Sequence, residues 1–338
     1  MADLVHLCDK SVMSDAKQQL ARALETALAQ YAETMGEAFP ILPALDVAND
    51  PDLWAVAEID GDEFRIRVST GTADCTASLW ASAFADGEFR KSFGIATGAD
   101  ASTMSHISLV WLMLHEMHHF QMRHFGAPTA RQPSQASVLK KHGLVTRTKK
   151  SASAHSSDAT EISLIFEMRA DHDATEMLLD AYSSDEWLDL RTRVAAISAM
   201  MMLIERADSS NQRLGITHPK AATRIFQLLG HVIDMPVIAA HLELNQGTDS
   251  QPRPDNLPTQ AEQESFAAQI VIPAFFDAVS LANITSAQTI TDDLGSATDF
   301  FHDVEAVKLD HSAAPNELVT VGAQQWADLV ALNTQISW

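Results

Sequence analysis

The chain has 338 residues, and its 23 lysine and arginine residues against 45 aspartate and glutamate residues give a formal net charge of −22. Apolar residues make up 46% and charged residues 20%, a balance typical of a folded globular protein. The acidity argues against general binding of nucleic acid or of membrane surfaces. Two cysteines, Cys8 and Cys75, are too few for a disulfide-stapled secreted scaffold, so we expect free thiols and a cytoplasmic protein.

The composition favours helix over sheet. Glycine (13 residues) and tyrosine (2 residues) are scarce, so we predict a mostly helical α+β fold. Residues 54–59 and 63–68 alternate apolar and polar side chains around an Asp60-Gly61 turn, which predicts a hairpin. Residues 89–95 are predicted to form a short strand. Apolar side chains three and four residues apart predict helices over residues 16–35, 74–85, 105–124, 158–182, 185–207, 219–234 and 263–281.

The charge pattern reverses in one segment of this acidic chain. Residues 117–157 contain several lysines and arginines but no acidic residue, and their Ser, Thr and Pro content predicts a mobile basic loop over residues 127–157. We interpret this loop as a solvated insertion or, alternatively, as a lid over the cleft between neighbouring helices. A Pro-, Gln- and Asn-rich break at residues 245–260 predicts two parts, residues 1–245 with the chemistry and a helical C-terminal region, 246–338.

A metal-binding pattern lies in the long apolar helix that is predicted over residues 105–124. His115, Glu116 and His119 form the pattern H-E-x-x-H, which on a helix places both imidazoles on one face, one turn apart. Glu116 would then lie beside a metal-bound water, an arrangement suited to metal-assisted hydrolysis. The apolar run at residues 110–114 predicts that this helix is buried, where two histidines and a glutamate would be costly without a metal.

A catalytic zinc site needs a third protein ligand and an open position for water. Glu167 and Asp171 lie four residues apart on the next predicted helix. One of these carboxylates can therefore bind zinc while the other forms a hydrogen bond to a histidine ligand. The remaining histidines near these motifs are interpreted as supporting or surface residues: His118, His124 and His172.

Taken in order, the motifs resemble those of the gluzincin metallopeptidases. They are His115-Glu-x-x-His119, Glu167-x-x-Ala-Asp171, Thr217-His218-Pro219 and Arg224-Ile225. The closest pattern is that of the group containing the CAAX prenyl endopeptidases, the heat-shock membrane peptidase and their soluble relatives, and it covers about residues 109–229. A second likeness is to the soluble phage-exclusion peptidases, which also carry H-E-x-x-H. Because the sequence offers no long uninterrupted apolar segment, prenylated or membrane-embedded substrates are not expected.

This resemblance implies a zincin-like metallopeptidase domain at residues 1–245, with a small β element before the active-site helix. It implies that Zn²⁺ is bound by His115, His119 and Glu167, with Glu116 as the general base. The expected substrate is a polypeptide, cut internally rather than at its ends. Nucleic acid and membranes are not expected partners, and the sequence leaves the oligomeric state open.

The resemblance also implies that His218 and Arg224 lie near the active site. His218 could donate a hydrogen bond to the oxyanion of the reaction. For Arg224 two roles stay open at this point, because it could orient His218 or pair with Asp171. The predicted hairpin has two possible roles as well: it completes the core, or its exposed edge binds an extended peptide by backbone pairing.

Two other classes of protein compete with the peptidase interpretation. Glu116 and His119 also form an E-x-x-H pattern, which occurs in carboxylate-bridged di-iron bundles. Such bundles need a second E-x-x-H on another helix, and this sequence contains none. The other alternative is a non-catalytic, zinc-stabilised scaffold or sensor that binds a partner protein. Glu116 argues against it, because a purely structural zinc site needs no base beside the metal.

Overall fold

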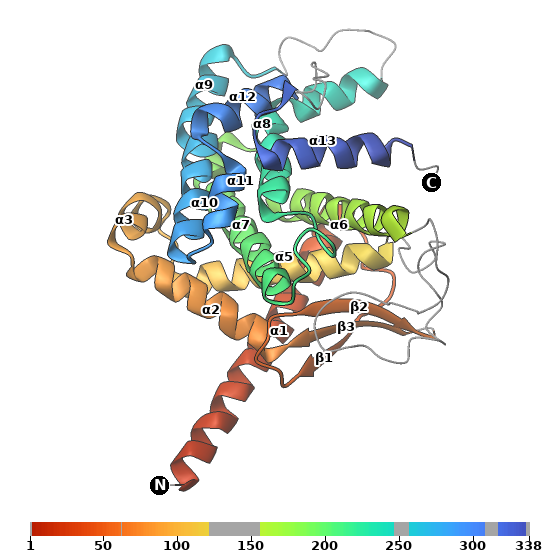
Figure 1. Cartoon of the computed structure of the whole chain (residues 1–338), viewed down its shortest axis with the longest axis vertical. Coiled ribbons are helices and arrows are strands. Elements are labelled where there is room, and N and C mark those ends of the chain that lie inside the picture. Colours follow the sequence, from red (N-terminus) through yellow and green to blue (C-terminus); the bar gives the residue numbers. More distant parts are fainter. Residues whose placement is uncertain (1, 62, 122–155, 247–256, 308–316, 336–338) are drawn as a thin grey trace.

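The structure is a computed structural model that describes the chain apart from residues 1, 62, 122–155, 247–256, 308–316 and 336–338. The described residues form a mostly helical fold with one small sheet, which confirms the predicted α+β class. In Figure 1 the sheet lies at one end of the helical body, next to α5 (Ala101–Gln121). Nearly all of the predicted basic loop, residues 127–157, falls outside the described residues.

The N-terminal helix α1 (Ala2–Met35) contains the predicted helix 16–35 and begins before it. Leu20, Leu24 and Tyr31 lie on its buried face, as their spacing predicts. Three strands follow: β1 (Ala44–Ala48), β2 (Ala55–Asp60) and β3 (Glu63–Ser69).

The sheet contains the predicted hairpin and one additional strand. Strands β2 and β3 pair antiparallel, and Gly61 between them has a φ of +64°, which a tight turn requires and glycine adopts at little cost. Strand β1 was not predicted, and it pairs parallel to β3, giving the order β1-β3-β2. Strand β2 is therefore an edge strand, and it packs beside α5, the helix that carries the H-E-x-x-H pattern.

Helix α2 (Thr70–Ala85) begins directly where β3 ends. Ser69 caps it by accepting a hydrogen bond from the backbone N–H of Thr72. Gly71 touches the neighbouring loop so closely that a Cβ atom would lie 2.2 Å from the carbonyl oxygen of Pro51. The prediction of a helix over residues 74–85 is confirmed.

The predicted strand at residues 89–95 is wrong. This segment is helical, with α3 (Gly87–Phe89), a π-helical turn (Arg90–Gly94) and α4 (Ile95–Thr97). Phe89 and Phe93 are buried against Trp80 and stack on each other with ring centroids 5.0 Å apart. Their spacing of four residues is helical, whereas Ile95, which the strand pattern would bury alongside them, is 73% exposed.

Four long helices form the centre of the molecule. Each overlaps one predicted helix, and the observed and predicted ranges differ at their ends. The four helices are α5 (Ala101–Gln121), α6 (Ser156–Leu179), α7 (Trp187–Ser210), which follows a short 3₁₀ turn (Ser184–Glu186), and α8 (Ala221–Gln246). Helix α5 packs against α1, α2, α6 and α7, so it is surrounded on most sides. This explains why its apolar side chains do not form a single stripe.

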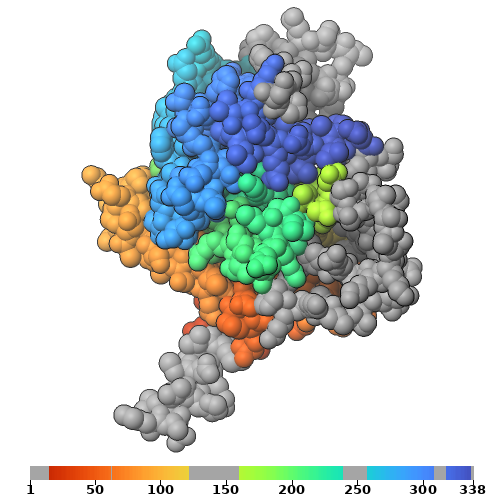
Figure 2. All heavy atoms as spheres, viewed as in Figure 1, coloured from red at the N-terminus to blue at the C-terminus, as the bar shows by residue number. Residues whose placement is uncertain are grey.

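The C-terminal region packs against the central helices. It contains α9 (Gln260–Phe266), a π-helical turn (Ala267–Val271), α10 (Ile272–Ile284), α11 (Gln288–Leu294), α12 (Ala297–Ala306) and α13 (Val321–Asn333). The first three together contain the predicted helix 263–281, whereas the last three were not predicted. Helix α10 packs on α7 and α13 packs on α6 and α8, and in Figure 2 the blue C-terminal helices lie directly against the green ones.

One hydrophobic core runs through both predicted parts of the chain, from Leu20 in α1 to Ala323 in α13. The division into residues 1–245 and 246–338 stays a prediction. The stretch Gln260–Ile284 is long and apolar enough to cross a membrane by length and composition, and half of its most apolar window is buried inside the fold. Among the described residues, Cys75 is a free thiol, as predicted.

A buried ion pair joins the two parts. Arg191 of α7 donates two hydrogen bonds to Asp277 of α10, at 2.7 and 2.8 Å, and both residues are buried. Burial raises the pKa of the Asp277 carboxyl even though Arg191 opposes this shift. Burying this pair therefore costs desolvation energy, and loss of either partner would leave the other charge buried and unpaired.

We predict that Asp277→Asn lowers the free energy of unfolding by about 3 to 5 kcal/mol, because it leaves the Arg191 charge buried without its partner. The double variant Arg191→Met, Asp277→Leu should recover most of that loss. Urea denaturation followed by circular dichroism measures both, with the exposed Glu264→Gln on α9 as control. Equal loss in the single and double variants would contradict the pairing argument.

Candidate metal centre

Helix α5 presents four ionisable side chains to the interior, His115, Glu116, His118 and His119. His115 and His119 are 2% and 5% exposed, and Glu116 between them is 3% exposed. The four-residue spacing places both imidazoles on the face of α5 that meets α6. The Nε2 atoms of the two rings lie 3.1 Å apart, so they converge on one point.

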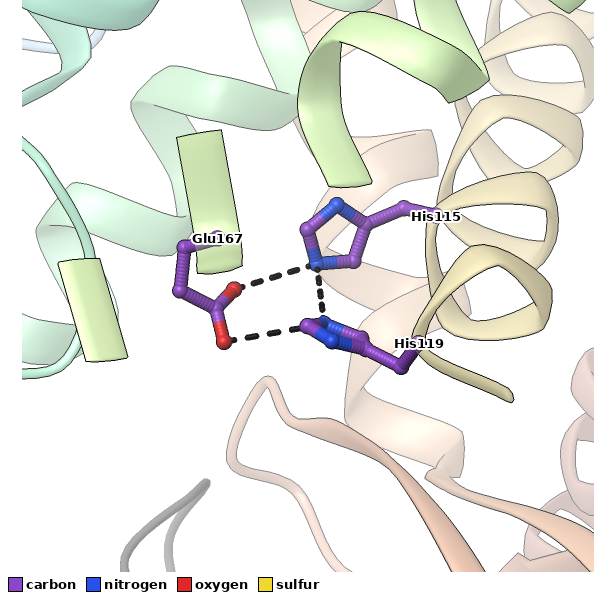
Figure 3. Close-up of side chains that lie close together, drawn as sticks. All are labelled: His115, His119 and Glu167. Atoms are coloured by element: carbon purple, nitrogen blue, oxygen red, sulfur yellow. Dashed lines mark hydrogen bonds and ion pairs between the residues drawn. The ribbon is translucent and has the colours of Figure 1, made fainter. Parts of the chain in front are cut away.

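Helix α6 brings a carboxylate to this point. One oxygen of Glu167 lies 3.2 Å from His115 Nε2, and the other lies 3.6 Å from His119 Nε2 (Figure 3). Glu167 is 1% exposed. Two helices far apart in sequence thus place one carboxylate and two imidazoles around a common centre, and these three residues form a group that could hold a metal ion.

The spacing of these donor atoms suits a bound cation. Ligands at zinc distances of about 2.0 to 2.1 Å in tetrahedral geometry stand about 3.4 Å apart. The three contacts at 3.1, 3.2 and 3.6 Å bracket that value. In addition, Oε2 of Glu167 is buried and its contacts lack hydrogen-bond geometry, although it faces His115. A cation at the centre would satisfy this oxygen.

The electrostatics of the centre favour positive charge. Burial alone would keep His115 neutral, but the neighbouring carboxylates of Asp171 and Glu167 outweigh it and raise its pKa to about 10. Burial likewise opposes the charge on Glu167, yet His119, His218 and His115 hold its pKa well below the usual range. The same carboxylates that favour a proton on His115 would favour a metal ion in its place.

Glu116 points into a pocket beside the centre. Its Oε2 atom is buried without a hydrogen-bond partner among the described residues, and burial raises the pKa of its carboxyl. The pocket lies between the residues that lead into β2, the face of α5 that carries Glu116, and the turn after α7. Its lining includes Trp54, Leu112, Glu116, Ile204, Asp208 and His218.

Asp171 supports the centre by contacting the other nitrogen of the His115 ring. One of its oxygens lies 3.0 Å from His115 Nδ1, and Arg224 of α8 donates two hydrogen bonds of 2.6 Å to the carboxylate. The guanidinium of Arg224 also lies over the Trp111 ring, 5.6 Å from its centroid. Of the two roles left open for Arg224, the structure shows its pairing with Asp171.

The turn between α7 and α8 brings His218 to the centre. Its Nε2 atom lies 3.5 Å from Glu167 Oε2, and its Nδ1 atom lies 2.8 Å from Asp208 Oδ2. Thr217 donates a second hydrogen bond to the same Asp208 oxygen, at 2.7 Å. Burial opposes the charged imidazole, but Glu167 and Asp208 together raise the pKa of His218.

Asp208 was not predicted as a site residue. It lies ten residues before His218 at the end of α7, and no spacing rule connects a helix end to a turn residue of that kind.

His118 was interpreted as a supporting or surface residue, and the structure buries it at 3% exposure. Burial, with His115 and His119 nearby, lowers the pKa of His118 to about 3, so this imidazole is neutral. His124 falls outside the described residues.

We predict that Asp171→Asn weakens binding of a divalent metal at this centre about 10- to 100-fold, because the carboxylate no longer holds His115 in place. Equilibrium dialysis against zinc measures the affinity, with the exposed Asp189→Asn on α7 as the matched control. An affinity equal to that of the wild type would show that Asp171 serves only to pair with Arg224.

Comparison with known proteins places a family match over this region. Residues 85–245 match the protein-family model described as Peptidase U49. No curated protein and no solved structure matches the chain. The matched segment contains every side chain of the candidate centre, and it supports a peptidase function. The resemblance to the gluzincin group stays a prediction.

Proposed function

We propose that this protein is a zinc-dependent metalloendopeptidase whose centre is formed by His115, His119 and Glu167. One observation carries the proposal: two imidazoles and a carboxylate from α5 and α6 converge in a buried site, with Glu116 directly beside them. The family match supplies the peptidase class, and the donor set supports the metal. Imidazole nitrogen and carboxylate oxygen are ligands that zinc accepts in catalytic sites.

The residues present fit a catalytic ion better than a structural one. Three protein ligands would leave a position open for water, and the pocket lined by His115 and Glu116 lies beside these ligands. When bound, zinc would activate a water molecule and polarise the scissile carbonyl. We assign the proton transfer and the stabilisation of the developing negative charge to side chains of this chain.

Glu116 is the general base in this proposal. Its buried carboxylate has an oxygen without a partner, and burial raises its pKa toward the range that suits proton transfer near neutral pH. It would take a proton from the attacking water and deliver it to the nitrogen of the departing amine. No other described carboxylate lies both in the pocket and next to His115 in the chain.

His218 would stabilise the negative charge that develops on the carbonyl oxygen. Asp208 holds its Nδ1 side at 2.8 Å, so the imidazole is fixed with Nε2 toward the centre. The raised pKa of His218 favours the charged imidazole, which could donate through Nε2. Asp208 acts through His218 and is a positioning residue.

An extended polypeptide is the substrate that the surroundings favour. Strand β2 is the edge of the sheet, it packs beside α5, and the chain entering it at Trp54 and Ala55 lines the pocket. An edge strand offers unpaired backbone groups to which an extended peptide can add as a further strand. Binding along a strand, rather than in a closed end pocket, supports internal cleavage.

We expect Glu116→Gln to retain the metal and to lose about 10²- to 10⁴-fold in the rate of peptide hydrolysis, because the proton acceptor is gone. A library of synthetic peptides, with cleavage read by mass spectrometry, measures this without knowledge of the natural substrate. Glu88→Gln, at an exposed position outside the pocket, is the control. Hydrolysis at the wild-type rate by Glu116→Gln would eliminate the proposed mechanism.

A second variant tests the oxyanion role. His218→Gln should lower kcat by about 10²- to 10³-fold, as removal of one oxyanion donor does, and should leave bound zinc and KM nearly unchanged. Steady-state kinetics on one peptide from the library, together with elemental analysis, gives all three quantities. A loss of zinc in this variant would instead assign His218 to the metal ligands.

A further inference from the structure

A second group of potential metal ligands lies between α6 and α8, apart from the catalytic residues. His172 and Glu176 are one turn apart on α6, and His231 extends from α8 toward them. One ligand atom from each of the three lies within 4.8 Å of the other two. We call these three residues the α6–α8 cluster.

The contacts in this cluster converge on one carboxylate oxygen. His172 Nε2 lies 3.3 Å from Glu176 Oε1, and His231 Nδ1 lies 4.0 Å from the same atom. The two imidazole rings meet edge to face, with centroids 5.5 Å apart and an interplanar angle of 84°. An ordinary helix-surface pair would account for the contact of His172 with Glu176, but not for the second imidazole directed at the same oxygen.

We infer that the α6–α8 cluster is a second binding site for a zinc-class transition metal, one that ties α6 to α8. Its two nitrogen donors and one carboxylate oxygen form a set that zinc, cobalt, nickel and copper prefer, and that magnesium and calcium do not. The distances of 3.3 and 4.0 Å lie on either side of the spacing of about 3.4 Å between tetrahedral zinc ligands.

Burial distinguishes this site from the catalytic one. The side chains of His172 and Glu176 are 41% and 52% exposed, whereas that of His231 is 11% exposed. The site thus has one largely buried imidazole, that of His231, and is open to solvent on the α6 side. A metal there can exchange with the solution, so we expect weaker binding than at the buried centre.

The position of the cluster suggests what the metal does. Helix α6 also carries Asp171, and α8 carries Arg224, which hold each other through two hydrogen bonds. Arg224 and His231 are two turns apart and so lie on the same face of α8. A small crevice is lined by Asp171 and Arg224 together with both histidines of the cluster. A metal at the cluster would therefore strengthen the same helix contact that supports His115.

Zinc stoichiometry of the tag-free, full-length chain tests this inference. After equilibrium dialysis against zinc in the presence of excess Mg²⁺, elemental analysis should find two zinc ions per chain in the wild type. The variant His172→Gln, Glu176→Gln should bind one, with at least about a tenfold loss of affinity for the second ion. Both replaced side chains are partly exposed, so the variant is expected to fold. His302→Gln, an exposed histidine on α12, is the control and should bind two.

Thermal melting provides a second measurement. Added zinc should raise the Tm of the wild type by a further step after the first equivalent, and this step should be missing in the double variant. Saturation of the wild type at one zinc that Glu167→Ala loses, or a second equivalent that the double variant still binds, would overturn the inference.

One further variant distinguishes a failure of the catalytic proposal from a failure of this inference. Glu167→Ala removes a ligand of the buried centre alone, so it should retain the zinc of the α6–α8 cluster and its stabilising step. If Glu167→Ala binds two ions, the assignment of the catalytic centre is wrong, whereas the cluster is supported. If it binds none, the cluster does not hold zinc on its own.

Discussion

The cost of burying charge governs the centre of this protein. Three carboxylates, Glu116, Glu167 and Asp171, are each 3% exposed or less where α5 meets α6. Such groups are tolerated in an apolar interior only when cations or hydrogen-bond donors compensate for them. Arg224 compensates Asp171 through two hydrogen bonds, and the imidazoles of His115 and His119 face Glu167. One buried oxygen of Glu167 and one of Glu116 have no hydrogen-bond partner among the described residues, and a metal ion and a water molecule could satisfy them.

The packing of the fold follows from enclosing this centre. Helix α5 packs against α1, α2, α7 and the sheet, and its residues His115 and His119 face Glu167 of α6. The C-terminal helices complete the enclosure, because α13 packs across α6 and α8 on the side away from the sheet. The edge strand β2 and the turn carrying His218 leave one side accessible, and the pocket lies there. The candidate ligands are thus packed against other helices on one side and are accessible from the pocket on the other. A catalytic metal site requires both features.

The long helices and the hairpin could be predicted because their signals are local: apolar spacing for the helices, alternation and a glycine turn for the hairpin. The same locality allowed the candidate metal ligands to be identified from the sequence, since His115 and His119 share a helix face and Glu167 and Asp171 share another. The strand predicted at residues 89–95 failed because Phe89 and Phe93 fit both periods, and only contact with Trp80 decides between them. Asp208 and the α6–α8 cluster depend on which helices meet in space. That information lies in the packing and not in any local pattern.

The most direct test is the metal content of the purified protein, measured by elemental analysis in the His172→Gln, Glu176→Gln background so that the α6–α8 cluster does not contribute. The account predicts one tightly bound zinc per chain, retained in Glu116→Gln and lost in both His119→Ala and Glu167→Ala, with circular dichroism showing that each variant folds. A folded protein without bound metal, or a zinc content unchanged by Glu167→Ala, would contradict the three-ligand centre on which the proposed peptidase mechanism depends.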